Sequence, residues 1–168
     1  MKNFLIYLAV ALLFLVIEST LFRILLPSLL IPDVILIMTI YLGFHNASIE
    51  GVLTTFILGY IADVFSGGII GLSSFTLILI FLITTGLSKT ITLNSMLVKI
   101  AGTIFLSIVK GIFTYIALIF LNQAIPFYII FPIAISTGIS SSFIFILLSK
   151  IESYFASYKG EDRITNRY

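Results

Sequence analysis

The sequence predicts an all-α integral membrane protein with six transmembrane helices. Of its 168 residues, 60% are hydrophobic and only 10% are charged, and the mean hydropathy is +1.25. A water-facing surface needs far more charge than this, which excludes a soluble domain of the same length. Long apolar stretches recur from one end of the chain to the other. Lysine and arginine also fall almost entirely on one side of the resulting topology.

Four segments are long enough to cross the membrane without help, because a helix needs about 20 apolar residues to cross ~30 Å of hydrocarbon. These segments are Asn3–Leu26, Ile69–Leu87, Val98–Leu121 and Phe127–Ser149. The first resembles a signal peptide, with one lysine before an apolar run. However, Ala9 and Ala11 lie inside that run and no A-x-A-like site follows it. We therefore expect an uncleaved first transmembrane helix.

Two shorter apolar runs, Val34–Phe44 and Gly51–Phe65, lie between the first and second long segments. Polar or helix-breaking residues bound each of them, so we predict that they form the second and third helices. The second helix reaches only about 17 Å. It must therefore extend back through Pro32, be supported by its neighbours, or stop part-way across the membrane.

The distribution of cations tests this count. With six helices and a cytoplasmic N-terminus, seven cations lie on the inner side and the outer loops hold only Arg23. The seven are Lys2, Lys89, Lys99, Lys150, Lys159, Arg163 and Arg167. This asymmetry agrees with the positive-inside rule and predicts that both termini are cytoplasmic. Residues 1–150 then form one six-helix domain. Residues 151–168 form a short polar cytoplasmic tail, which we expect to continue the last helix for two turns.

Three charged residues fall at membrane depth, where insertion costs roughly 2.5–3.5 kcal/mol each. Lys110 lies near the centre of the fifth helix, while Glu18 and Asp63 lie in the outer halves of the first and third helices. Asp33 is expected in the first outer loop. We predict an intramembrane ion pair between Lys110 and either Glu18 or Asp63. Such a pair could fix how the helices dock or could belong to a proton or ion relay.

Small residues recur every four positions in and after the third helix. They are Gly51, Thr55, Gly59, Asp63, Gly67 and Gly71. A small-xxx-small ladder lets another backbone approach closely, so this face could serve internal packing or could receive a partner's helix. Ser66, Gly67 and Gly68 predict a tight hairpin. Asp63 could accept hydrogen bonds from that turn and from the start of the next helix, or could contact a partner directly.

Several function classes lack the residues that they require. Cysteine is absent, which excludes a disulfide framework and a thiol nucleophile. The only histidine, His45, lies in an inner loop, so we expect no metal site. Asp63 lies in G-Y-I-A-D rather than in the G-x-G-D of an intramembrane aspartyl protease, and the G-x-S-G of a serine intramembrane protease is missing. We therefore expect no catalytic residues, no cofactor, no enzyme activity and no nucleic-acid partner.

One combination of motifs resembles a known family. Residues 32–43 read PDVILIMTIYLG, and E-G-x₇-G-x₃-D-x₂-S-G-G-x₂-G follows. This resembles the MreD family of bacterial rod-shape proteins, which also agrees in chain length and helix count. The matching residues are Pro32, Asp33, Tyr41, Gly43, Glu50, Gly51, Gly59, Asp63, Ser66, Gly67, Gly68 and Gly71. The region after Lys89 adds little to the resemblance.

The resemblance implies a non-enzymatic scaffold of the cell-elongation machinery in the bacterial cytoplasmic membrane. Its expected partners are membrane lipids, the single-pass protein MreC, MreB filaments, and the peptidoglycan polymerase and transpeptidase. The family's fold is similar to the six-helix substrate-binding subunits of energy-coupling-factor vitamin transporters, which supplies an alternative function. In those subunits an A-x-x-x-A motif often docks the coupling subunit. Here Ala9 and Ala11 are two apart, so that motif is missing.

Overall fold

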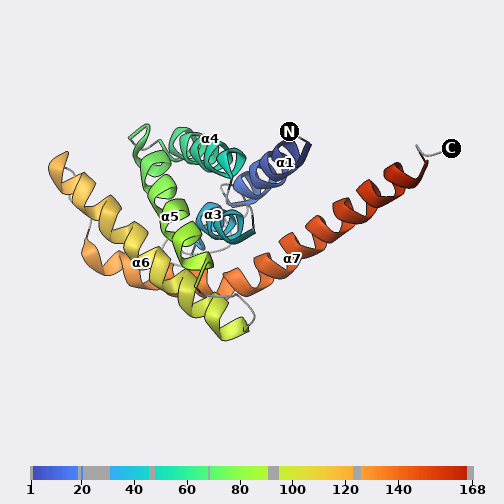
Figure 1. Ribbon diagram of the computed structural model, residues 1–168. Helices are drawn as coiled ribbons and strands as arrows, with labels where there is room; N and C mark the ends of the chain where they lie inside the picture. The colour runs from blue at the N-terminus through green and yellow to red at the C-terminus, as the bar shows by residue number, and fades with distance from the viewer. Residues whose placement is uncertain are drawn as a thin grey trace.

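The computed structural model describes residues 2–18, 20, 31–45, 48–67, 69–90, 95–122 and 126–165. Within these residues the chain is all-helical, without strands, and has the six α-helices that the sequence predicts (Figure 1). They are α1 (Lys2–Ile17), α3 (Val34–His45), α4 (Ile49–Ser66), α5 (Leu72–Ser88), α6 (Met96–Phe120) and α7 (Ile130–Thr165). A short 3₁₀ helix, η3 (Phe127–Ile129), precedes α7.

Three stretches of helix are long and apolar enough to cross a membrane within the described part of the chain. They are Ile49–Ser66, Met96–Phe120 and Phe127–Ile151. The helices α3 and α5 are apolar but shorter. These properties support a membrane protein, in agreement with the composition.

The short helix α3 forms the centre of the molecule. All ten residues from Val34 to Gly43 are buried, and α3 packs against each of the other five α-helices. Figure 1 shows it almost end-on in the middle of the bundle. A helix that is hydrophobic all round is stable only when it is covered on every side. Of the three possibilities for this short helix, support by its neighbours is confirmed, whereas extension back through Pro32 is wrong because α3 begins at Val34.

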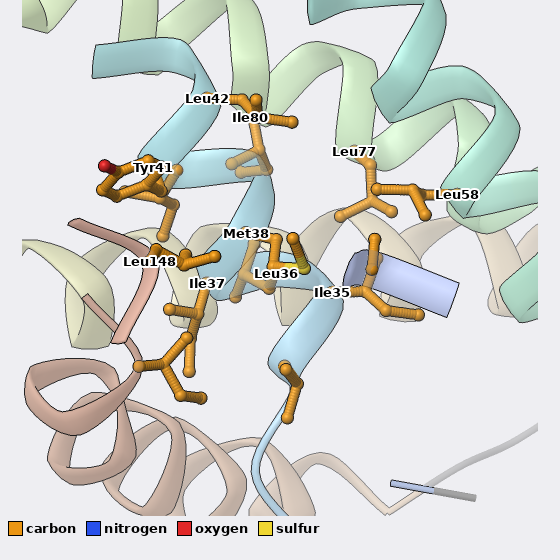
Figure 2. Packing of buried hydrophobic residues seen from close by; sticks show 14 of the residues in the cluster. Ile35, Leu36, Ile37, Met38, Tyr41, Leu42, Leu58, Leu77, Ile80 and Leu148 are labelled. Atoms are coloured by element: carbon orange, nitrogen blue, oxygen red, sulfur yellow. The ribbon is translucent and has the colours of Figure 1, made fainter. Parts of the chain in front are cut away.

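The hydrophobic core follows from this arrangement. Buried side chains of α3 meet apolar side chains from α4, α5 and α7, as Figure 2 shows. Leu58 comes from α4, Leu77 and Ile80 from α5, and Leu148 from α7. By contrast, large apolar side chains on the outer faces of α6 and α7, such as Phe105 and Phe143, are exposed. Exposed apolar surface of this kind suits contact with lipid rather than water.

The last helix is longer than predicted. It has 36 residues and continues through the tail to Thr165, well beyond the expected two turns. In Figure 1 its C-terminal half extends away from the other helices. Residues 151–165 contain good helix formers such as Glu, Ala, Lys and Arg and no proline, so nothing in this stretch stops the helix early. Pro132 lies in the first turn of α7, where proline is tolerated because no intrahelical N–H bond is required there.

Candidate functional site

Asp33 caps the N-terminus of the central helix. Its Oδ1 atom accepts a hydrogen bond from the N–H of Leu36 at 2.9 Å, and its carbonyl oxygen accepts one from Ile37 at 3.2 Å. The first N–H groups of a helix have no intrahelical acceptor, and aspartate is among the best residues for supplying one. The N–H of Asp33 in turn donates to Thr137 Oγ1 of α7 at 3.0 Å. Asp33 therefore joins the start of α3 to α7.

Lys110 of α6 forms its salt bridge with Asp33. Its Nζ atom donates to Asp33 Oδ2, the oxygen not used in the cap. The side chains of Lys110 and Asp33 are only 18% and 21% exposed, so water screens this attraction much less than it would on an open surface. Both oxygens of Asp33 are thus engaged, one by the backbone of α3 and one by α6.

The predicted partners of Lys110 are therefore wrong: neither Glu18 nor Asp63 forms the ion pair with it. Asp33 lies in the non-helical stretch directly before α3, as expected, but its carboxylate reaches a lysine near the middle of α6.

Glu18 nevertheless belongs to the same polar region. Its Oε2 atom accepts a hydrogen bond from the N–H of Val34, the first residue of α3, at 3.3 Å. We call Glu18, Asp33, Lys110 and Thr137 the α3 N-terminal cluster. It joins the chain that follows α1 to α3, α6 and α7. The geometry can fix the relative positions of these elements, because the contacts of Asp33 with Lys110 and Thr137 and of Glu18 with Val34 each connect different segments of the chain.

A cavity of about 210 Å³ lies beside this cluster. Asp33 and Lys110 line it together with Ser107, Thr114 and Tyr115. The remaining lining comes from Gly111, Leu118, Pro126, Ile129, Ile130 and Ile133. The cavity is thus mainly apolar with a few polar groups at its wall, which is the usual composition of a ligand site.

Asp63 has a different role from the one expected in an ion pair. Its Oδ2 atom accepts a hydrogen bond from the N–H of Gly71 at 2.8 Å. The N–H of Ser73 lies 3.1 Å from both carboxylate oxygens. Asp63 is 3% exposed and caps the N-terminus of α5 from the last turn of α4. The prediction that it holds its own hairpin closed is confirmed. The described donors, Gly71 and Ser73, lie at the start of α5.

The small-residue ladder packs inside the molecule. Gly51, Thr55, Gly59 and Asp63 are all buried. A Cβ atom at Gly59 would lie only 2.4 Å from the Cα atom of Ser74 and 2.7 Å from its N atom. The backbone of α5 thus occupies the groove that glycine leaves in α4. The hypothesis that this face receives a partner's helix is wrong at Gly59, because the neighbouring helix of the same chain already fills the groove.

The end of this hairpin uses glycine for its backbone conformation. Gly67 is the C-cap of α4 with φ +66°, and Gly71 is the N-cap of α5 with φ +97°. Side chains rarely adopt this left-handed region, so glycine is favoured at both positions. Gly68 lies outside the described residues.

The structure also locates the remaining candidates. His45 is the last residue of α3, where its ring stacks on Tyr41 with centroids 4.1 Å apart. Within the described residues, no group of three His, Cys, Asp or Glu side chains gathers to hold a metal ion. The sequence predicted neither the contact of Thr137 with Asp33 nor the ion pair of Asp33 with Lys110. An aspartate directly after proline and before an apolar run is a known helix-start signal, which indicates the cap but not its lysine partner.

Comparison with protein-family models, with curated proteins and with solved structures found no match for the chain.

Proposed function

We propose that this chain is a non-enzymatic membrane scaffold of the MreD type, acting in the bacterial cytoplasmic membrane in cell elongation and cell-shape maintenance. Its expected partner is MreC, with MreB filaments and the peptidoglycan polymerase and transpeptidase in the same assembly. The order and spacing of the motif from Pro32 to Gly71 carry this proposal. The α3 cap at Asp33 and the α4–α5 hairpin at Gly59, Asp63 and Gly71 support it, because the motif residues are the ones that shape these contacts.

Because of this packing, a partner surface must lie on a face of the molecule other than the small-residue ladder. The ladder on α4 is covered by α5, but the opposite face of α4 exposes a stripe of large apolar side chains. This stripe, which we call the outer α4 face, consists of Ile49, Leu53, Phe56, Tyr60 and Val64. Aromatic side chains such as Phe56 and Tyr60 provide large contact areas at helix interfaces. We infer that a single-pass partner helix packs on this face.

Co-purification in mild detergent tests the proposal. The full chain is expressed with MreC from the same bacterium, and a pull-down on either protein should recover the other. The double substitution Phe56→Ala and Tyr60→Ala should lower recovery, whereas Ile139→Ala and Phe143→Ala on the exposed face of α7 should not. Failure of the unmodified proteins to associate, together with unchanged cell shape on depletion of this chain, would overturn the scaffold function. If only the α7 variant lowers recovery, the partner surface lies on α7 instead.

One observation favours a second function, that of a substrate-binding subunit of a small-molecule transporter. The cavity beside Asp33 and Lys110 has polar groups at an otherwise apolar wall. Its volume of about 210 Å³ is below the roughly 300–1,000 Å³ that is usual for small-molecule sites. A vitamin-sized compound retained through purification at one per chain, and lost on substitution of Lys110, would favour transport over the scaffold.

A further inference from the structure

A second cavity, of about 310 Å³, lies at the end of the bundle where α3 and α5 end and α6 begins. Phe44 from α3, Leu87 from α5 and Phe145 from α7 contribute to its wall. The first turns of α6 supply most of the remaining lining, including Lys99 and Gly102. Apart from Lys99 and Thr103, the side chains that line this cavity are apolar.

Lys99 is the one charged residue in the lining of this cavity. Its Nζ atom lies 5.9 Å from the centre of the Phe145 ring. In the part of the chain that the structure describes, no carboxylate forms an ion pair with Lys99. A half-buried ammonium group over an aromatic ring is favourable, but among the described residues it still leaves the lysine without a counter-ion.

Further cations lie at the same end of the bundle. Lys89 directly follows α5, and Lys150 lies on α7 a little more than one turn beyond Phe145; both are exposed. Glu50, at the start of α4, also lies at this end. Because Lys89, Lys99 and Lys150 outnumber this one carboxylate, the net charge of the named side chains is positive. Cations next to an apolar cavity between helices are the arrangement that recognises anionic lipid head groups.

We propose that this cavity holds part of one acyl chain of an anionic phospholipid, whose phosphate pairs with Lys99. The volume is at the small end of the range for ligand cavities, so it accommodates a chain segment rather than a whole lipid. The apolar walls suit the chain, and the uncompensated ammonium suits the phosphate. This inference is independent of the scaffold function, because it rests on a different surface and on lipid chemistry alone.

Gly102 provides a direct way to fill the cavity. A Cβ atom built at Gly102 meets no other heavy atom within 4 Å, so Gly102→Leu can place its side chain in the cavity without striking the backbone. Gly86 of α5 has the same open surroundings but is not part of the lining. Gly86→Leu is therefore the matched control.

Native mass spectrometry of the full chain in detergent tests the proposal with two lipids of identical acyl chains, phosphatidylglycerol and phosphatidylcholine. The unmodified protein should retain phosphatidylglycerol preferentially. Lys99→Gln should weaken the binding of phosphatidylglycerol about fivefold, the usual contribution of one juxtamembrane cation, and leave the binding of phosphatidylcholine unchanged. Gly102→Leu should weaken the binding of both lipids, whereas Gly86→Leu should change the binding of neither. An equal effect of Lys99→Gln on both lipids, or no effect of either cavity variant, would overturn the proposal.

A measurement on the unmodified protein covers the case in which a variant fails to fold. Phosphatidylglycerol with a photoreactive acyl chain should label residues 98–106 of α6 or Phe145 of α7. Labelling confined to other segments would overturn the proposal. The native mass spectra would also show whether the protein is a dimer that Gly102→Leu converts into a monomer without changing lipid retention. That result would assign the cavity to a second copy of the chain and would also overturn the proposal.

Discussion

Asp33 and Asp63 each place a carboxylate at the N-terminus of a helix, α3 in one case and α5 in the other. The free N–H groups and the positive end of the helix dipole both favour an anion at this position. An aspartate in an apolar chain is expensive to bury unless such donors surround it. The two aspartates thus have a local structural reason that does not depend on catalysis.

Removing the carboxylate of Asp63 should destabilise the α4–α5 hairpin. Asp63→Ala leaves the N–H groups of Gly71 and Ser73 without their acceptor, so we expect a loss of about 2 kcal/mol. Asp63→Asn keeps one carbonyl oxygen and should lose less. Thermal unfolding in detergent measures the order of stability. Equal stability of all three proteins would contradict the capping role.

The ion pair predicts energetic coupling between Lys110 and Asp33. Lys110→Met alone leaves the Oδ2 atom of Asp33 without its donor, and Asp33→Asn alone leaves the ammonium group without a carboxylate. The double variant should therefore lose less unfolding free energy than the two single variants lose together, and the difference should be about 0.5–3 kcal/mol. A double-mutant cycle on unfolding free energies measures this term.

The pair Asp63 and Lys110 is the control for that cycle, because Asp63 accepts its hydrogen bonds from α5 instead. Their effects should add within about 0.5 kcal/mol. Coupling of Lys110 to Asp63 but not to Asp33 would show that the ion pair in the structure is not the one that stabilises the protein.

Part of this site could be predicted from residue types and part could not. The cost of charge in the membrane identified Lys110 and Asp63 as residues that need partners, and the hairpin spacing identified the correct role for Asp63. The predicted partner of Lys110 is wrong because Asp33, directly before α3, was expected in an outer loop, out of reach of the middle of α6. A contact of this kind depends on how far α3 reaches into the bundle, and no local spacing encodes that depth.

At the scale of elements, the close backbone approach at Gly59 joins α4 to α5. Any side chain at this position meets backbone rather than the movable end of another side chain. The ladder could be read from the sequence, but its occupant could not, because small-xxx-small spacing is the same for an internal neighbour and for a foreign helix.

Gly59→Ala should therefore destabilise the protein by about 1–3 kcal/mol, as overpacking usually does. The matched substitution Gly102→Ala, also inside a helix, meets no neighbour within 4 Å. It should be neutral or stabilising by up to about 1 kcal/mol, because alanine is the better helix former. Chemical unfolding of both variants measures the difference. Equal tolerance at the two positions would contradict the packing of α4 on α5.

At the scale of the molecule, hydropathy was sufficient to predict the order of the helices that the structure describes. Within the described residues, each of the six α-helices overlaps its predicted segment. The arrangement was less accessible: the weakest apolar segment, Val34–His45, became the centre. Composition reports that a segment is apolar, but whether lipid or protein covers it depends on the packing of all other helices.

The distribution of charge predicts the orientation of the whole molecule. We expect both termini and the α5–α6 connection in the cytoplasm and the α4–α5 turn outside. The chain has no cysteine, so single substitutions give a clean labelling assay in intact cells. Ser66→Cys and Thr90→Cys are both exposed. An impermeant maleimide should label the first and spare the second. The reverse pattern would invert the topology.

The burial of α3 has a consequence for how the protein is made. A helix of 12 residues that is covered on every side is too short to hold itself in a bilayer, and it is synthesised long before α7, which supplies part of its cover. We therefore expect α3 to reach its final position late in biogenesis. A chain ended at residue 122 should leave Ile37→Cys open to alkylation, whereas the full chain should protect it. A defect in α5, α6 or α7 should therefore also uncover α3, because each of these helices packs against it.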